Sequence, residues 1–544
     1  MNKIAALAVV SFALFTSGCG GHQSLSPTPP SLPQSLAAGG VPGSPDVSPD
    51  EQANIGPLIT VTASVILSIP TTASAAKSVS ITVNGGTPVV ANTSSGSLGC
   101  VGSNPLVCTV SVKAPTSSDQ FSIKTFNASN GTGTVLATGN ALQAITTTNK
   151  TVKITLAGTP NSIVLALKTV SPRECNPSTN IPLFVAVKDS AGEIIVTSNY
   201  GLTITLHDAD ATGTTVLSTT TVTSSSTTAM LAYNGDLLKS ATISATAPGI
   251  TAVNVHNAVL SPSQMLYVLD LANHAVDVFP STATGNIAPT RRLKMTGPDN
   301  GSNEDVLTSN CTIFVSDSGS TLAAVFSFAG RANGTVLPVT EITGTKTELL
   351  ALGVAINPTN GKIYSPIQVS STPGIGIWPP NANGNVAPAA SIIGSKTSIG
   401  NPSSLAFDSS GKLYVLAFRN ILVFATGAAG NVAPVQNLST GFFCPDGVAV
   451  DATDQIYVSD NCAAEVKIWA KGATGNAAPL RTIQLPGSGD ANGVGVDYAN
   501  DTFTADLFLS TVYSFGPTAN GKVPPRTTIS GANTTLFEPN YLSL

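Results

Sequence analysis

The stretch that decides the fold runs from Phe424 to Pro434 and reads FATGAAGNVAP. A large aromatic residue stands six positions before a glycine, and the glycine opens the run Gly-Asn-x-Ala-Pro. Full or partial versions of this pattern place the motif glycines at Gly285, Gly334, Gly384, Gly430, Gly475 and Gly521. The aromatic residues before them are Phe279, Phe328, Trp378, Phe424, Trp469 and Phe515. Six agreements of this kind indicate an internal repeat.

The repeat period predicts the architecture. Successive motif glycines are 45 to 50 residues apart, and periods of that length with short apolar runs are typical of four-stranded β-propeller blades. In the repeat that begins near Pro445, we expect strands at Gly447–Asp451, Ile456–Asp460, Val466–Trp469 and Leu480–Ile483. The sequence therefore predicts an all-β chain with a six-bladed propeller at residues 261–544.

Each part of the motif has a structural explanation. Gly-Asn supplies the positive φ that a tight hairpin requires. Proline is expected to open the fourth, outermost strand, where its missing N–H costs no ladder bond. The aromatic residue on the third strand is expected to fill the space between adjacent blades. The motif is thus interpreted as architecture at the outer rim, away from the central channel.

The two ends of the repeat region suggest how the ring closes. The first blade opens at Leu266–Asp270 and lacks an inner strand, whereas the last residues, Glu538–Leu544, match the opening of one. We expect the C-terminal residues to pair with residues 265–270 and close the ring. The alternative is that Val255–Leu260 provides the missing strand.

Composition limits the function classes. The chain has 544 residues, of which 42% are hydrophobic and 10% charged, with a formal net charge of −5. A typical soluble domain has roughly 25% charged residues, so polar uncharged side chains must cover this surface. There is no basic patch to neutralise phosphates, and a nucleic-acid partner is not expected.

The first apolar stretch predicts export. Lys3 precedes an uncharged run from Ile4 to Phe15, which is short for a membrane span and suits a signal peptide. The following Thr16–Cys19 resembles the lipobox of bacterial lipoproteins, which implies that residues 1–19 are a signal peptide ending in the lipidated Cys19. The alternative is an ordinary secretory signal. By the same resemblance, Gly20 favours the outer membrane of a cell that has two.

Residues 20–57 are rich in Pro, Ser and Gly and predict an extended tether. Two β-sandwiches are expected next, at residues 58–160 and 161–260, because short strand-like runs alternate with turn signals about every ten residues. The stretch Val187–Gly192 resembles the strand and turn of bacterial immunoglobulin-like repeats, with Asp189 and Gly192 making the turn. This resemblance implies an immunoglobulin-like fold for the sandwiches.

Cysteine use fits an oxidising compartment. Cys100 and Cys108 predict a hairpin-closing disulfide, and Cys444 and Cys462 flank a strand pair with both residues expected in loops on one face. Cys175 and Cys311 remain. They either bridge the second sandwich to the repeats or stay free and buried. No cysteine spacing resembles a zinc site.

The repeats resemble NHL-type propellers, in a broad group that includes SMP-30-like lactonases and the streptogramin lyase. Leu269–Val276 carries the Asp, Asn-His and aliphatic positions typical of an NHL repeat, and Ser459–Asn461 is a partial copy. The enzymes of this group place metal ligands or a His/Glu set at the top of the channel. His274 is the only histidine in the repeats, so no catalytic pair is expected there, and we interpret it as the structural histidine of its repeat.

Carboxylates are the remaining candidates for a metal site. Asp270, Asp317 and Asp460 each follow a second strand and offer oxygen ligands of the kind calcium prefers. We favour the simpler interpretation that each caps its own turn, so no metal and no cofactor is predicted. Asp408, Asp451 and Asp497 end inner strands at the opposite face, where the same explanation applies.

These observations predict a lipid-anchored, extracytoplasmic protein of the bacterial cell envelope. Its propeller is expected to bind a protein or glycan on its loop face, with the membrane as a partner through the lipid anchor alone. No catalytic residue is assigned. The competing hypothesis is a metal-dependent hydrolase or lyase of the SMP-30 kind, and a third is a purely structural envelope component.

Overall fold

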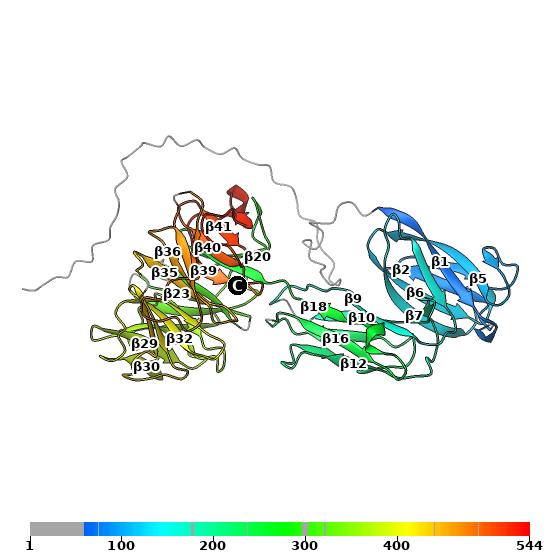
Figure 1. Ribbon diagram of the computed structural model, residues 1–544, viewed down its shortest axis with the longest axis horizontal. Coiled ribbons are helices and arrows are strands. Elements are labelled where there is room, and N and C mark those ends of the chain that lie inside the picture. Colours follow the sequence, from blue (N-terminus) through cyan, green and yellow to red (C-terminus); the bar gives the residue numbers. More distant parts are fainter. Residues whose placement is uncertain are drawn as a thin grey trace, which may run out of the picture. The chain divides into compact units, whose positions relative to one another are not determined.

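The structure is a computed structural model that describes residues 59–544, except 74, 176–178, 237, 296–302, 310, 320–321, 440 and 488. The predicted signal peptide, Cys19 and tether lie outside the described residues. Contacts divide the chain at Pro57, and only the unit from Leu58 onward is treated below. This unit is all-β (Figure 1), with 3-10 turns as its helical elements. In the part of the chain that the structure describes, no helix has both the length and the apolar character to cross a membrane.

Two sheets enclose one apolar core in the first module. In strand β1, from Thr60 to Ile69, every second side chain from Ala63 onward is buried, because successive side chains of a strand point to opposite faces. The buried side chains face this core. The strands of the first sheet are β1 (Thr60–Ile69), β4 (Cys100–Val101), β5 (Leu106–Pro115) and β8 (Thr151–Thr155). Those of the second are β2 (Ser78–Val83), β3 (Val89–Asn92), β6 (Ser118–Phe126) and β7 (Val135–Ala144).

The second module has a core of its own but shares a sheet with the first. Strand β8 runs parallel to β11, pairing Ile154 with Ile194, so the first sheet continues into the second module. One layer contains β9 (Ser162–Leu167), β10 (Thr179–Lys188), β11 (Ile194–Ile195), β13 (Thr215–Leu217), β15 (Ala229–Tyr233) and β17 (Val255–His256). The other contains β12 (Ile204–Asp208), β14 (Thr221–Val222), β16 (Ala241–Thr246) and β18 (Ala258–Leu260).

The turn predicted at Asp189 forms as expected. The carboxylate of Asp189 accepts hydrogen bonds from the N–H groups of Ala191 at 3.0 Å and Glu193 at 2.9 Å. Gly192 has a φ of 77°, a left-handed value that glycine adopts without strain.

Six antiparallel sheets of propeller-like type follow, and we number them as the first to sixth repeat sheets (Figure 1). The first contains β19 (Met265–Asp270), β20 (Ala275–Pro280) and β21 (Arg291–Lys294), with β25 (Gly334–Thr335) and β43 (Pro539–Ser543) at its edges. The second contains β22 (Asn303–Ser309), β23 (Thr312–Asp317), β24 (Ala324–Ala329) and β26 (Thr340–Thr343). The third contains β27 (Ala355–Ile356), β28 (Ile363–Val369), β29 (Thr372–Trp378) and β30 (Ala390–Ile393).

The last three repeat sheets have the same strand order. The fourth contains β31 (Pro402–Phe407), β32 (Leu413–Ala417), β33 (Asn420–Phe424) and β34 (Gln436–Ser439). The fifth contains β35 (Pro445–Val450), β36 (Ile456–Asp460), β37 (Glu465–Trp469) and β38 (Arg481–Gln484). The sixth contains β39 (Asn492–Val496), β40 (Thr502–Asp506), β41 (Thr511–Phe515) and β42 (Thr527–Ile529).

The C-terminal strand pairs where the sequence predicted. Strand β43 lies antiparallel to β19, with Ser543 opposite Tyr267 and Leu542 opposite Val268. The alternative, in which Val255–Leu260 supplies this strand, is wrong. Those residues form β17 and β18, which pair with β9 and β16 of the second module.

The motif glycines join neighbouring sheets, a role that the sequence did not predict. All six have φ between 61° and 82°. Each one forms a parallel bridge to the fourth strand of the preceding repeat sheet, for example Gly430 to Ile392 and Gly475 to Leu438. The first repeat follows the same rule, because Gly285 bridges to Ile529 of the sixth sheet. The motif therefore covers the outer edge of the sheet before it, which would otherwise expose unpaired backbone groups.

The motif asparagine secures the same junction. Asn431 Oδ1 accepts a hydrogen bond from Lys396 N–H at 2.7 Å, just beyond the fourth strand of the preceding sheet. Asn431 also lies against Gly394, where an added Cβ would come within 2.5 Å of its side chain. The motif proline precedes the strand instead of opening it, since Pro434 stands two residues before β34 and the first ladder bond is donated by Val435.

The motif aromatics fill the space between neighbouring sheets, as predicted. Trp469 is fully buried and packs with Tyr414, Leu438 and Phe442 of the preceding repeat. Its indole N–H donates to the carbonyl of Ala477 in its own motif at 2.9 Å. Phe279 packs with Phe503 and Ile529 of the sixth sheet, so the same contact joins the last repeat to the first.

Candidate functional site

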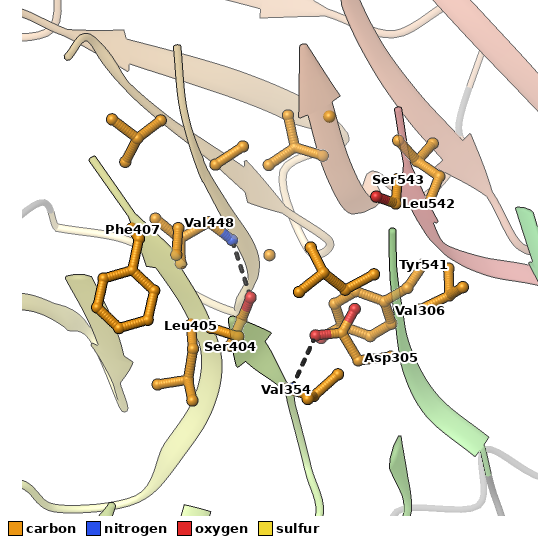
Figure 2. A pocket seen from close by; sticks show the side chains of 18 of the residues that line it. Asp305, Val306, Val354, Ser404, Leu405, Phe407, Val448, Tyr541, Leu542 and Ser543 are labelled. Atoms are coloured by element: carbon orange, nitrogen blue, oxygen red, sulfur yellow. Dashed lines mark hydrogen bonds between the residues drawn. The ribbon is translucent and has the colours of Figure 1, made fainter. Parts of the chain in front are cut away.

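The innermost strands of the repeats surround a cavity of about 290 Å³ (Figure 2). Its wall is mainly aliphatic, because each inner strand contributes side chains such as Val306, Leu405, Val448 and Leu542. Strands β22, β27, β31, β35, β39 and β43 all take part. A concave apolar site with few polar groups is the usual form of a small-ligand pocket.

The polar side chains at this cavity hold neighbouring strands together. Asp305 Oδ2 accepts a hydrogen bond from Val354 N–H at 3.2 Å, and Ser404 Oγ accepts one from Val448 N–H at 3.2 Å (Figure 2). In both pairs the acceptor belongs to one repeat and the donor to the next repeat. These groups are therefore engaged in structure before any ligand arrives.

We call one side of the repeat sheets the loop face. It consists of the turns between second and third strands and of the connections from each fourth strand to the next first strand. Antiparallel order places both kinds of connection at the same ends of the strands. Cys444 and Cys462 lie in two such connections and form a disulfide, which ties them together.

Four phenylalanines on the loop face expose most of their surface to solvent. They are Phe418 at 65%, Phe443 at 72%, Phe508 at 73% and Phe537 at 61%. Leu509 beside Phe508 is also exposed. Single exposed apolar residues are ordinary, whereas large apolar residues grouped on one face are a common feature of contact surfaces.

Three carboxylates gather on the loop face beside these aromatics, and we call Asp446, Asp490 and Asp506 the acidic recess. Burial, then the charges of Asp506 and Asp446, raises the pKa of Asp490 to about 6. Burial also raises the pKa of Asp446 and that of Asp506. Asp506 has no exposed surface, and main-chain hydrogen bonds from Leu509, Asp490 and Phe508 oppose the rise of its pKa.

The recess residues also organise the surrounding backbone. Asp506 Oδ1 accepts a hydrogen bond from Leu509 N–H at 3.0 Å, which fixes the turn that carries Phe508. Asp446 Oδ2 accepts one from Gly493 N–H at 2.9 Å, and Tyr541 Oη donates to the Asp446 carbonyl at 2.8 Å. The recess thus joins the fifth and sixth repeat sheets to the C-terminal strand.

This recess was not predicted from the sequence. An aspartate after the second strand was expected in three repeats, but Phe503–Asp506 repeats the spacing of Tyr457–Asp460, an aromatic residue three positions before an aspartate. This spacing would have identified Asp506 as a fourth member. Asp490 lies in a connection with no motif, and only the folded chain brings it to Asp506.

The predicted metal candidates act as loop caps and do not converge. Asp270 accepts side-chain and main-chain hydrogen bonds from Asn273 and main-chain bonds from Phe537 and Glu538. Asp317 accepts one from Gly319 N–H at 2.8 Å, and Asp460 binds the N–H groups of Phe443 and Cys444 at 3.2 Å each. Within the described ranges, no three His, Cys, Asp or Glu side chains come together as a metal-holding group.

The aspartates at the far ends of the inner strands cap turns in the same way. Asp451 Oδ1 accepts hydrogen bonds from Thr453 N–H at 2.8 Å and Gln455 N–H at 2.9 Å. Asp408 and Asp497 make the corresponding pairs of bonds in their own repeats. These carboxylates are accounted for by turn geometry.

His274 occupies a turn and has a φ of 46°. Its N–H donates to the Leu271 carbonyl at 3.2 Å, and its own carbonyl accepts from Met295 N–H at 3.1 Å. This backbone role agrees with a structural histidine. Among the hydrogen bonds of the described residues, none joins His274 to Asp446, Asp490 or Asp506.

All six cysteines after Cys19 are paired in the structure. Cys100 bonds to Cys108 across a hairpin, and Cys444 bonds to Cys462 on the loop face. Cys175 bonds to Cys311 over 136 residues, which connects the second module to the second repeat sheet. Of the two alternatives for this last pair, the structure has the bridge.

Comparison with known proteins identifies no family for this chain. No family model matches the chain, and no curated protein matches it. A protein of unknown function from Bacteroides caccae is 10% identical, with 52% of this chain and 98% of that chain covered and a TM-score of 0.37. The WD40 repeats of RRP9 are 14% identical over 41% of this chain and 62% of theirs, with a TM-score of 0.31. A streptogramin B lyase is 9% identical over 44% of this chain and 72% of its own, with a TM-score of 0.30.

Proposed function

We propose that this protein is a lipid-anchored, extracytoplasmic binding module of the bacterial cell envelope. In this proposal the six repeat sheets are the blades of an NHL-type propeller, closed by β43 and by the bridge from Gly285 to Ile529. The two N-terminal modules are immunoglobulin-like spacers. The propeller presents its loop face to a protein or glycan partner.

The observation that carries the binding role is the set of exposed phenylalanines on the loop face. Phe443, Phe508 and Phe537 each leave more than half of their surface in water, although burying them would favour folding by about 1.5–3 kcal/mol each. Aromatic side chains at the centre of a contact surface commonly provide most of the binding energy. Their position away from the motif junctions leaves them free for a partner.

Two further observations support the location. Three disulfides are formed, and such bonds persist mainly in oxidising, extracytoplasmic compartments. The sequence of Thr16–Cys19 resembles a lipobox. Attachment of two or more acyl chains to Cys19 would hold the protein stably at a membrane.

The test of the binding role compares two triple variants of the exported protein, purified in mild detergent. The first replaces Phe443, Phe508 and Phe537 by serine on the loop face. The control replaces Leu337, Val435 and Leu480, which are equally exposed residues just before fourth strands, by serine. Binding is measured on a glycan array and on peptide libraries of random sequence.

We expect the loop-face variant to lose at least about tenfold in affinity for the best ligand, and the control to change by less than about twofold. Equal losses in both variants, or binding that needs neither surface, would contradict the proposal. The competing hydrolase or lyase hypothesis predicts tightly bound metal in stoichiometric amount together with lactonase activity. Metal analysis of the same preparation distinguishes the two.

A further inference from the structure

The cavity between the inner strands is closed toward the loop face by Tyr541 of β43. Its Oη donates a hydrogen bond to the carbonyl of Asp446 in β35 at 2.8 Å, and its ring belongs to the same apolar cluster as Val306 of β22. Strand β43 lies in the first repeat sheet, β22 in the second and β35 in the fifth. The buried side chain of Tyr541 therefore lies across the channel.

Glycines bring the inner strands close together at the same level. An added Cβ on Gly353 would come within 2.3 Å of the Ser403 carbonyl oxygen in the next repeat. On Gly447 it would come within 2.8 Å of the Gly493 Cα, and on Gly493 within 2.9 Å of the Tyr541 Cα. Strands approach this closely only where a side chain is absent. The channel is thus constricted at its loop-face end.

The cavity of about 290 Å³ lies on the other side of this constriction (Figure 2). Among the described residues, its wall begins at buried positions such as Val354, Ser404 and Val494 and continues to the last residues of the inner strands, which are half-buried. We call the side on which these strands end the far face, where the turns between first and second strands lie. The cavity is therefore a cup with its floor toward the loop face and its mouth on the far face.

Large apolar side chains surround the mouth of the cup. Five inner strands carry one where they end, and all five residues line the cavity and are half-buried. They are Ile356, Phe407, Val450, Val496 and Leu544. Apolar side chains grouped at the mouth of a concave site are typical of a ligand pocket.

The wall of the cup also offers main-chain hydrogen-bonding groups. Strands β22, β27, β31, β35 and β39 each have one neighbour in their sheet, so their other edges present N–H and C=O groups without a ladder partner. Among the described lining residues there is one carboxylate, that of Asp305, and no basic side chain. The cup therefore suits a partly polar molecule without negative charge.

Volume and depth limit the size of this molecule. The volume of about 290 Å³ is about twice the ~150 Å³ that holds benzene in an engineered cavity. On β22 the wall extends from Asp305 to Ser309, which is roughly 13 Å at the rise of a strand. With carbon–carbon bonds of about 1.5 Å, an extended chain of about eight to ten carbon atoms spans this depth.

We propose that the cup binds an uncharged aliphatic molecule of about eight to ten carbon atoms with a hydroxyl or carbonyl head group. Medium-chain alcohols and esters are of this class. The chain lies against the aliphatic side chains, and the head group exchanges hydrogen bonds with main-chain groups of the wall. This site lies apart from the loop face and does not rest on the function proposed there.

Other small molecules fit the cup less well. The anion of a fatty acid would meet Asp305 in the wall and the turn-capping Asp408, Asp451 and Asp497 near the mouth. A hexose would place hydroxyl groups against aliphatic side chains, which leaves them without hydrogen-bond partners. For a bare metal ion, the described residues contain no converging group of three His, Cys, Asp or Glu side chains.

The test is equilibrium dialysis with radiolabelled straight-chain 1-alkanols of four to twelve carbon atoms. It uses the full chain with Cys19→Ser, which needs no detergent that would take up the alcohols. We expect the affinity to rise about fourfold per methylene from 1-butanol to 1-octanol, the usual effect of burying a CH₂ group. Beyond about ten carbon atoms the rise should stop, because the floor is closed. Octanoate should bind at least about tenfold more weakly than 1-octanol.

Substitutions at the mouth assign this binding to the cup. Leu544→Trp fills part of the mouth and should weaken 1-octanol binding at least about tenfold. Val450→Phe fills it from another strand and provides a second test should the first variant fail to fold. The matched control is Leu480→Trp, at an exposed position before a fourth strand, which should change binding by less than about twofold. Circular dichroism shows which variants are folded.

The outcomes separate this inference from the proposed function. Replacement of Phe443, Phe508 and Phe537 by serine should leave 1-octanol binding unchanged, and a loss there would place the alcohols on the loop face and overturn the cup. An affinity that keeps rising to twelve carbon atoms and is unchanged in Leu544→Trp would show adsorption to a surface. Absence of binding by every alcohol would equally refute the cup, while the loop-face proposal would stand or fall by its own test.

Discussion

Gly285 and Ile529 form a parallel β-bridge although they are 244 positions apart in the sequence. Beside this bridge, Thr284 Oγ1 donates a hydrogen bond to the Thr528 carbonyl. An equivalent bridge joins each of the remaining pairs of successive repeat sheets. The first and sixth sheets are therefore connected at their outer rim by the motif and at the inner strands by β43. Two independent attachments hold the ends of the repeat region together.

The inner attachment can be tested at Leu542, which is 5% exposed and packs with Val268 and Phe503. Leu542→Ala should lower the free energy of unfolding by about 2–5 kcal/mol, the usual range for a buried leucine. Denaturant titration measures it. Val259→Ala, at an exposed position in the second module, is the control and should cost much less. A small loss at Leu542 would show that the pairing of β43 with β19 contributes little to stability.

The corresponding outer junction between the third and fourth repeat sheets can be tested at its motif asparagine, Asn431. Asn431→Ala removes the hydrogen bond to Lys396 N–H and should cost about 0.5–1.5 kcal/mol. The control is Asn437→Ala. Asn437 is exposed, and its side chain makes no hydrogen bond to the described residues, so the substitution should cost less than about 0.5 kcal/mol. The two values come from the same denaturant series, and equal costs would remove the motif asparagine from the junction.

The inter-sheet aromatic can be tested at Trp469. The Trp469→Ala variant should lose about 3–5 kcal/mol of unfolding free energy, because the ring is fully buried, lies edge-on to Phe442 at 5.3 Å and donates to Ala477. Trp469→Phe keeps most of the apolar contact and should cost clearly less. If both variants lost the same amount, the indole hydrogen bond and not the packing would dominate.

Stability should depend on pH through Glu174. Burial raises the pKa of this residue in the folded protein from 4.5 to about 7. The folded state therefore binds the proton more tightly, so the stabilising effect is complete below pH 4.5, decreases up to about pH 7 and is lost above it. Glu174→Gln should become more stable relative to the wild-type protein as pH rises through this window. Unfolding at pH 4, 6 and 8 gives the difference, and a constant difference would contradict the assignment.

Membrane attachment should depend on Cys19. Cys19→Ser removes the site of acylation, and we expect the protein to move from the membrane fraction to the soluble extracytoplasmic fraction. Labelling with palmitate, which should be lost in the variant, provides an independent readout. Cys175→Ser, which breaks the disulfide to Cys311, serves as the control for loss of a cysteine elsewhere and should leave the attachment unchanged. Retention of both membrane location and label in Cys19→Ser would refute the lipobox interpretation.

The repeat unit could be predicted because its signals are local. In the fifth repeat, the strands expected at Gly447–Asp451 and Ile456–Asp460 appear as Pro445–Val450 and Ile456–Asp460. Turn residues and alternating apolar residues determine such strands within a few positions. The pairing of the C-terminal strand was predictable too. The first repeat lacks an inner strand, and the last residues of the chain match the opening of an inner strand.

The junctions and the recess could not be predicted from local pattern. The bridge from Gly430 to Ile392 depends on how two sheets pack. The motif sequence alone does not indicate with which residue its glycine pairs. The continuous sheet through Ile154 and Ile194 depends in the same way on contacts between modules. Asp490 approaches Asp506 only because the connection that leads into the sixth repeat sheet meets the β40–β41 turn on one face.

The bridge at Gly285 also sets the order in which the chain can complete its structure. Contacts between neighbouring repeats are separated by about one repeat length, whereas those of Gly285 and Val268 wait for residues 529 and 542. High sequence separation makes such contacts slow to form. During synthesis or export, the inner edge of the first sheet, strand β19, therefore stays unprotected until the last residues arrive, whereas its outer edge, β21, is covered by β25. A chaperone that shields exposed strand edges would matter most in that interval.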